Sequence, residues 1–352
     1  MSTSPSPSPP RSSYSSGDLQ KLLGDVITHQ TSLADIDLLL TAGADPNGEV
    51  RQGLRPLHYA AFQNYGACIP MLVRRGADVN ATNHVGYTPL HISAERGYLT
   101  CSQFLIECGA AVNFDDTDTS LPESARILAS LTIHPLSLAI EGRHTACVDL
   151  FLRSGANPNR RHFLGNEINL VPLDNLPCLE LLLRHGADPD AFSRAGLTTL
   201  MKACKQGNID VVKLLLDYGA AVNIQCPSKF ERRTALHVAI ESESADIIAL
   251  LLDHGAMTRA PAGYKYSALE CAVVADNSAA CRLLLDRGAD ANDVNEDGCT
   301  SLQIVCATEG LRNQRCIIES LLQHGAQPKL LHKPFLLFQS VSNSPGGISL
   351  LH

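Results

Sequence analysis

The stretch "HVGYTPLHISAERGYLTCSQFLIECGAAVN" spans residues 84–113 and contains side chains of the kinds from which active sites are built. It holds His84 and His91, Cys101 and Cys108, and a threonine next to a proline. Such a set can serve catalysis, can ligate a metal, or can only build structure. The recurrence of the stretch along the chain decides among these three roles.

The stretch does recur. A Gly-Ala pair ends a leucine-rich run at Gly43, Gly76, Gly109, Gly155, Gly186, Gly219, Gly255, Gly288 and Gly325. The steps between these glycines are 33, 33, 46, 31, 33, 36, 33 and 37 residues. In six repeats, a leucine in a motif like TPLH lies 19 residues before the glycine: Leu57, Leu90, Leu136, Leu200, Leu236 and Leu269. A fixed period near 33 residues is typical of a helical solenoid.

Four segments resemble the ankyrin-repeat family. They are "RPLHYAAFQNYGACIPMLVRRGADVN", "TPLHISAERGYLTCSQFLIECGAAVN", "TTLMKACKQGNIDVVKLLLDYGAAVN" and "TALHVAIESESADIIALLLDHGAM". The resemblance covers residues 18–328 and rests on T-P-L-H-x-A within the 33-residue period. It implies an all-α solenoid of about nine helix-turn-helix units with hairpin-like finger loops. It also implies a protein that is not an enzyme and that holds partner proteins on its concave surface.

Composition narrows the class of protein. The chain has 352 residues, a net charge of -8 and a pI of about 5.9, without the dense Lys/Arg stripe that nucleic-acid binding requires. No run approaches 18 apolar residues, so we expect no membrane span. The N-terminus lacks the apolar core of a secretory signal. The twelve cysteines are scattered without a C-x-x-C pair. We therefore expect a reduced protein of the cytoplasm, with the nucleus as the alternative.

Three regions are predicted along the chain. Residues 1–17 are Ser/Pro-rich and are expected to be disordered, because they have little to bury. Ser4, Ser6 and Ser8 each precede a proline and are candidate phosphorylation sites, although the favoured interpretation of the segment is a solvated tail. Residues 18–328 form the solenoid, and residues 329–352 form a short tail outside the repeats.

Two repeats depart from the pattern. The step from Gly109 to Gly155 exceeds the period by 13 residues and carries the acidic run "DDTD". Prolines 172 and 177 fall in the repeat that ends at Gly186. Because a central proline breaks a helix at a cost of about 3 kcal/mol, we expect a short or irregular first helix in that repeat.

The histidine of TPLH occupies a sequence position that has an equivalent in eight repeats. We call this position the slot. The slot holds His58, His91, His237, Ser137, Asp174, Met201, Glu270 and Gln303. A slot that accepts both Met and Ser carries no common chemistry, and the resemblance implies that its histidines bond to neighbouring repeats. Cys101 and Cys108 are also too far apart for a paired zinc ligand set. We therefore predict no catalytic, cofactor or metal site.

An enzyme site hidden in residues 156–180 is an alternative reading. That segment offers His162, Glu167 and Asp174, without a recognisable pairing of nucleophile and base.

Candidate partner-binding residues lie in the fingers. They are Arg51, His84, Tyr87, Phe192, Arg194, Tyr264, Tyr266 and Glu296. Exposed aromatic residues are frequent hot spots, which favours Tyr87, Phe192 and Tyr264. For each one, a solvated turn residue is the alternative. The resemblance also implies hydroxylation at Asn80, which ends the pattern Leu-x5-Asp-Val-Asn, although an asparagine there also suits a turn.

Two short segments partly resemble the SOCS box that follows the repeats in some ankyrin proteins. "SLQIVC" at 301–306 has its spacing but is expected to be buried in the last repeat, and "SLLH" at 349–352 ends before its cysteine. This incomplete resemblance implies elongin and cullin as partners. The alternative function is therefore the substrate-recognition subunit of a ubiquitin ligase.

Overall fold

The structure is a computed structural model. It describes residues 15–51, 53–113, 134–162, 165–227, 232–259, 266–295 and 297–328. The acidic insertion, the tail at 329–352 with its "SLLH", Tyr264, Glu296 and the three serines that precede prolines lie outside these ranges. The chain divides into two compact parts, Met1–Ala187 and Asp188–His352, and each is described by itself.

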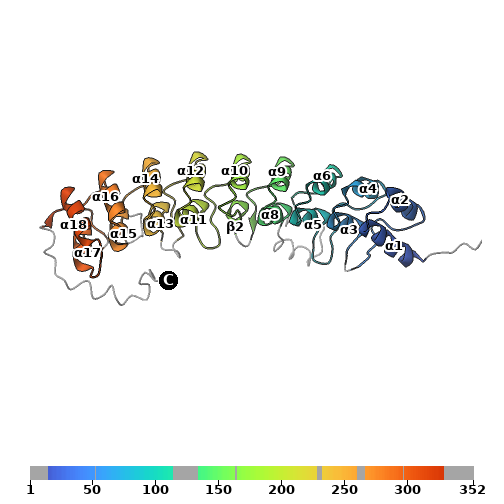
Figure 1. The fold of residues 1–352 in the computed structure, drawn as a ribbon, viewed down its shortest axis with the longest axis horizontal. Coiled ribbons are helices and arrows are strands. Elements are labelled where there is room, and N and C mark those ends of the chain that lie inside the picture. Colours follow the sequence, from blue (N-terminus) through green and yellow to red (C-terminus); the bar gives the residue numbers. More distant parts are fainter. Residues whose placement is uncertain are drawn as a thin grey trace, which may run out of the picture. The chain divides into compact units, whose positions relative to one another are not determined.

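The first part contains five repeats. Their first helices are α1 (Ser16–Thr28), α3 (Pro56–Phe62), α5 (Pro89–Glu95), α8 (Pro135–Glu141) and the 3-10 turn η2 (Glu167–Asn169). Their second helices are α2 (Leu33–Thr41), α4 (Ile69–Arg74, after the 3-10 turn Gly66–Cys68), α6 (Leu99–Glu107), α9 (Thr145–Arg153) and α10 (Leu176–Arg184). Within this part, α3 packs on α5 and α5 on α8, while α4, α6, α9 and α10 form a second row (Figure 1).

The second part contains four repeats built in the same way. Its first helices are α11 (Thr199–Lys205), α13 (Ala235–Glu241), α15 (Ala268–Val274) and α17 (Ser301–Ala307). Its second helices are α12 (Ile209–Asp217), α14 (Ala245–Asp253), α16 (Ser278–Asp286) and α18 (Gln314–Gln323). The described residues thus hold nine helical pairs, as the repeat pattern predicts, with η2 in the place of one first helix.

The two kinds of helix bury different faces. In α5, every residue from Pro89 to Ala94 is buried, and the proline opens the helix where its missing N–H is not needed. In α12, only Val211, Val212, Leu215 and Leu216 are buried, at the i, i+1, i+4, i+5 spacing of an amphipathic helix. Helix α5 is therefore enclosed on nearly all sides, whereas α12 keeps one face in solvent.

The fifth repeat is irregular, as its prolines predict. The strand pair β1 (Arg161–His162) and β2 (Gly165–Asn166) leads into η2, and no longer helix precedes α10 in the described part of this repeat. Pro177 lies in the first turn of α10, where proline is tolerated. Asp174 does not occupy the shared slot, so that assignment is wrong. The proline-containing segment follows no helical register, and Asp174 is an exposed residue paired with Arg143 at 2.9 Å.

Gly97 shows why a glycine ends the first helix. Its φ is +69°, which L-residues other than glycine adopt with strain. A Cβ at this position would lie 2.3 Å from Nδ1 of His144, which precedes α9. That imidazole reaches back through Nε2 to the carbonyl oxygen of Glu95, 3.0 Å away. The glycine therefore makes room for a hydrogen bond between successive repeats.

Asparagine side chains connect successive repeats in a second way. Asn47 donates from Nδ2 to the Gly76 carbonyl oxygen at 2.7 Å and accepts at Oδ1 from the Asp78 N–H at 2.7 Å. The same donation to the glycine that ends the next repeat is made by Asn80, Asn113, Asn159, Asn223 and Asn292. We call this set the asparagine ladder. It satisfies carbonyl groups that a helix end leaves without partners.

Asp190 takes the ladder position in the sixth repeat. Its Oδ1 accepts from the Ala221 N–H at 2.9 Å, as an asparagine would. Burial raises the pKa of this carboxyl, the Ala221 N–H opposes that shift, and neighbouring Asp188 adds to it. A carboxylate has no N–H, so Asp190 cannot donate to the carbonyl oxygen of the next terminal glycine as the ladder asparagines do.

In the last repeat, the connection that contains the extra residues is held by one carboxylate. Asp276, at the end of α15, accepts from the N–H of Arg312 at 2.8 Å and from that of Asn313 at 3.0 Å. The Asn313 side chain returns a bond to the Asp276 carbonyl oxygen at 2.9 Å. The longer connection is therefore anchored before α18 begins.

The ladder leads to a stability prediction. Asp190→Asn should raise the free energy of unfolding by about 0.5–1.5 kcal/mol, because it restores one donor to a carbonyl oxygen. Urea denaturation followed by circular dichroism measures this change. Asp188→Asn is the control, since it removes the same charge and retains the Oδ1 that accepts from the Asp190 N–H at 2.9 Å. An equal gain in both variants would show that charge, and not the ladder, limits stability here.

Candidate functional site

His58 shows what the TPLH histidine does. Its Nδ1 accepts from the N–H of Arg55 at 3.2 Å, at the start of α3. Its Nε2 lies 3.0 Å from the carbonyl oxygen of Tyr87 in the next repeat. An Nδ1 that accepts leaves the proton on Nε2, so the ring is neutral and donates across the repeat boundary. The structural reading of this histidine is thereby supported.

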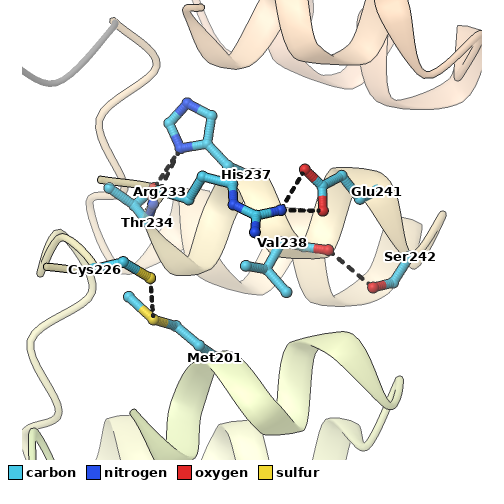
Figure 2. Close-up of polar contacts among 8 residues, drawn as sticks. All are labelled: Met201, Cys226, Arg233, Thr234, His237, Val238, Glu241 and Ser242. Carbon is cyan, nitrogen blue, oxygen red and sulfur yellow. Dashed lines mark hydrogen bonds and ion pairs between the residues drawn. The ribbon is translucent and has the colours of Figure 1, made fainter. Parts of the chain in front are cut away.

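His91 and His237 cap their helices in the same manner. The His91 Nδ1 lies 2.8 Å from the Thr88 hydroxyl and 3.1 Å from its N–H. Figure 2 shows the equivalent pair in α13, where Nδ1 of His237 lies 2.8 Å from the Thr234 hydroxyl. Burial lowers the pKa of His91 to about 3 and that of His237 to about 4. Both rings are therefore neutral structural groups at physiological pH.

Other residues in the slot serve the same helix start. Glu270 accepts from the Ser267 N–H at 2.8 Å, and Gln303 accepts from the Thr300 N–H at 2.8 Å. His, Glu and Gln thus each accept from the N–H that precedes the first turn. The slot also holds residues without this role, since Ser137 donates to Glu167 at 2.8 Å and the helix of Met201 is capped by the Thr198 hydroxyl at 3.3 Å.

Eight of the twelve cysteines are buried thiols. All twelve are free, and burial raises the pKa of Cys68, Cys101, Cys178, Cys204 and Cys281 to about 12. A thiol becomes a nucleophile or a metal ligand as the thiolate, and these thiols resist deprotonation. Nowhere in the described ranges do three or more His, Cys, Asp or Glu side chains cluster as metal ligands would. Nor does any described helix combine the length and hydropathy that a bilayer requires.

The segment 156–180 does not bring its two carboxylates together. Glu167 is 1% exposed and accepts from the Ser137 hydroxyl at 2.8 Å, and its Oε2 has no hydrogen-bond partner. Burial raises its pKa to about 7. Asp174 is exposed and bonded to both terminal nitrogens of Arg143, each at 2.9 Å. The first carboxyl is buried and bonded to Ser137, and the second is exposed and bonded to Arg143, so the two do not form a pair.

The finger candidates fall into three groups. Arg51, His84 and Arg194 are exposed. Phe192 and Tyr266 are half-buried, and Tyr87 is half-buried and stacked on the His91 ring with centroids 5.3 Å apart. Tyr264 and Glu296 lie outside the described residues. The aromatic candidates that the structure describes are therefore less exposed than predicted, because the ring of Tyr87 helps to hold the capping histidine.

Asn80 is an ordinary member of the asparagine ladder. It is exposed, its Oδ1 accepts from the Ala111 N–H at 2.8 Å, and its Nδ2 lies 3.4 Å from the Gly109 carbonyl oxygen. The turn role of this asparagine is thus occupied. Hydroxylation at this residue stays a prediction.

The segment 301–306 lies in α17, as expected. Ser301, Leu302, Ile304 and Val305 are buried there, and Thr300 caps the helix. A partner could reach these side chains only by unfolding the last repeat.

One polar contact in the second part was not predicted from the sequence. Arg233 holds both carboxylate oxygens of Glu241 from Nη1, at 3.1 and 3.0 Å, and so ties the finger before α13 to the end of that helix (Figure 2). Nearby, the N–H of Cys226 donates to the Arg233 carbonyl oxygen at 2.8 Å. Neither pattern nor spacing signals this pair, since its members lie eight residues apart across a helix start.

The buried histidines predict loss of stability in acid. A folded-state pKa below the unfolded value of 6.5 means that only the unfolded chain binds a proton as the pH falls through 6.5. Through His237, lowering the pH from 7 to 5 should therefore reduce the free energy of unfolding by about 2 kcal/mol. His237→Gln, chosen by analogy with Gln303, keeps an acceptor at the helix start and removes this titration. The melting temperature of the variant should fall less between pH 7 and pH 5 than that of wild type, and an equal fall would contradict the assignment.

Glu167 predicts the opposite dependence. Its folded-state pKa of about 7 lies above the ordinary value of 4.5, so its contribution to stability is present below pH 4.5 and is lost as the pH rises through 7. Glu167→Gln should therefore stabilise the protein by about 2–3 kcal/mol at pH 8 and have little effect at pH 4.5. Thermal unfolding at both pH values measures the difference. Glu107→Gln, at an exposed glutamate, should show no such pH dependence.

Comparisons with known proteins agree with the geometry. A model described as ankyrin repeats in three copies matches residues 27–116 and 170–262, and an ankyrin-repeat model matches residues 133–163. The chain also resembles the crystal structure of the ankyrin repeat domain of Bcl-3, described as a unique member of the IkappaB protein family. The TM-score is 0.53 at 23% identity, over 66% of this chain and 97% of that one, which is evidence for the fold alone. Because the three-copy model matches more than half of its residues, this chain belongs to the ankyrin-repeat family, whose repeats are protein–protein interaction modules.

Proposed function

We propose that this protein is a non-catalytic intracellular scaffold or adaptor that binds partner proteins through its fingers and the exposed ends of its first helices. One observation supports the proposal: the histidines and asparagines that recur with the repeat form hydrogen bonds within the solenoid itself. The capping histidines bond to helix starts and to neighbouring repeats, and the ladder asparagines bond to backbone groups. What varies from repeat to repeat is the exposed finger.

The state of the cysteines supports an intracellular location. All twelve thiols are free, and eight of them are buried. A chain with this many unpaired thiols suits a reducing compartment, where disulfides are rare.

Affinity capture tests the proposal. The tagged intact chain and the variant His84→Ala with Arg194→Ala would be used to capture proteins from a cell lysate, with mass spectrometry of what is retained. At least one reproducibly retained protein should fall roughly fivefold or more in the variant, because alanine removes exposed finger contacts. Circular dichroism of the variant should be unchanged. Lys213→Ala, at an exposed position of α12, is the control and should retain the full set.

The result also separates the alternatives. Identical protein sets for wild type and finger variant would reject these two fingers as the binding surface. Retention of elongin and a cullin would favour the ubiquitin-ligase receptor instead. Capture of no protein above background by any form would remove the scaffold proposal.

A further inference from the structure

The solvent-facing side of α3 has an unusual composition. Five of its seven residues are buried, which leaves Tyr59 half-buried and Phe62 47% exposed. Arg55 caps the start of the helix and is also partly exposed. Positions 55, 59 and 62 follow the i, i+4, i+7 spacing of one helix face. An arginine, a tyrosine and a phenylalanine therefore share the side of α3 that solvent reaches.

Two further arginines extend this face. The guanidinium carbon of Arg96, at the end of α5, lies 3.9 Å from the centroid of the Phe62 ring. Arg51, in the finger before α3, lies close enough to Tyr59 for its charge to lower the pKa of that hydroxyl against the effect of burial. We call the five residues Arg51, Arg55, Tyr59, Phe62 and Arg96 the arginine–aromatic strip. It lies entirely within the first part of the chain.

The strip is held in place by its own repeat. The finger that carries Arg51 is closed by the Val50 N–H, which donates to the Leu54 carbonyl oxygen at 2.9 Å, and by the Gly53 N–H, which donates to the Glu49 carboxylate at 2.6 Å. The Arg96 side chain is ordered against the Phe62 ring by cation–π attraction. A ligand would therefore meet preorganised groups and lose less entropy on binding.

The three arginines of the strip differ from most arginines on the second helices. Arg75 pairs with Asp37, Arg153 with Asp149, Arg184 with Glu180 and Arg287 with Asp253. Within the described ranges, no carboxylate lies within 4.0 Å of the guanidinium nitrogens of the strip. Acidic residues do occur near the strip: Glu49 lies in the finger of Arg51 and accepts from the Gly53 N–H, Asp25 of α1 acts on Tyr59, and Glu95 precedes Arg96 in sequence. Three guanidinium groups next to two aromatic rings thus lack the carboxylates that elsewhere neutralise such groups.

We propose that the arginine–aromatic strip binds an extended acidic peptide segment of a partner protein. The strip supplies three planar donors that match carboxylates and two partly exposed aromatic rings that an apolar side chain of the peptide would contact. Arginine and aromatic residues are also the types enriched at the energetic centres of interfaces. The proposal rests on the scaffold function above and specifies which residues make the contact and which chemistry they recognise.

A peptide fits the strip better than a nucleic acid does. Arg96 already covers one face of the Phe62 ring, so a base would have to displace it in order to stack there. The chain also has a net charge of -8, which repels a long polyanion and tolerates a few local carboxylates. The recognition we propose is therefore short-ranged.

Selection from a peptide display library tests the strip directly. The purified full chain would select from a library of random peptides of about twelve residues, a length that lets an extended segment cross the strip. The selected pool should be enriched in Asp and Glu. A labelled peptide from that pool should bind roughly tenfold or more weakly to the variant Arg51→Gln, Arg55→Gln, Arg96→Gln, because several charge-assisted contacts are lost.

A variant of equal charge provides the control. Arg74→Gln, Arg282→Gln and Arg312→Gln change three exposed arginines outside the strip and should leave the affinity within about twofold. Phe62→Ala should weaken binding without a change in net charge, and the circular dichroism of every variant should match wild type.

Four outcomes would overturn the inference. They are a pool without acidic enrichment, an equal loss in both triple variants, no loss for Phe62→Ala, and a uridine 12-mer RNA that binds more tightly and depends on the strip. Any of these leaves the scaffold proposal standing if lysate proteins are still captured through His84 and Arg194. Loss of that capture alone would leave the strip standing.

Discussion

The helices that begin each repeat are so short that their ends dominate their energetics. Outside the first and fifth repeats they have seven residues, and every helix leaves four N–H and four C=O groups without internal partners. Nearly all of these groups would be buried between neighbouring repeats, where an unmade hydrogen bond costs about 1–3 kcal/mol. The capping side chains, the histidine bonds across repeats and the asparagine ladder all supply hydrogen-bond partners to such backbone groups. Taken alone, such a helix would not persist in water.

The same constraint explains which features were predictable. The capping slot and the terminal glycines repeat with the period, so their structural role follows from the pattern itself. The irregular first half of the fifth repeat was predictable from its prolines. The misplaced Asp174 shows the limit, because once the helical register is broken a residue can no longer be assigned to a slot by counting. The ladder was missed for a different reason: its bonds join residues 27 to 42 apart, and an Asn in a turn looks the same with or without them.

Burial shifts the pKa of the enclosed ionisable groups towards their neutral forms. The capping histidines are held below their ordinary pKa, whereas Glu167 and Glu270 are each held near pH 7, in every case chiefly by burial. The two sets therefore act in opposite directions, since acid penalises the buried imidazoles and base penalises the buried carboxyls. Each of these groups also stabilises a helix start or a contact between repeats, which offsets the stability lost in acid or in base.

Charge on the surface follows a different rule from charge in the core. On the second helices, Arg75 reaches Asp37 of the preceding repeat and Arg287 likewise reaches Asp253 of the repeat before it. These arginines are already paired with aspartates of the solenoid and are therefore less available to a partner protein. On the strip, Arg51, Arg55 and Arg96 surround aromatic rings without such partners in the described residues. Since isolated surface ion pairs contribute little stability, leaving these arginines unpaired costs the fold almost nothing. A repeat can thus acquire a recognition surface without weakening the bonds that hold it to its neighbours.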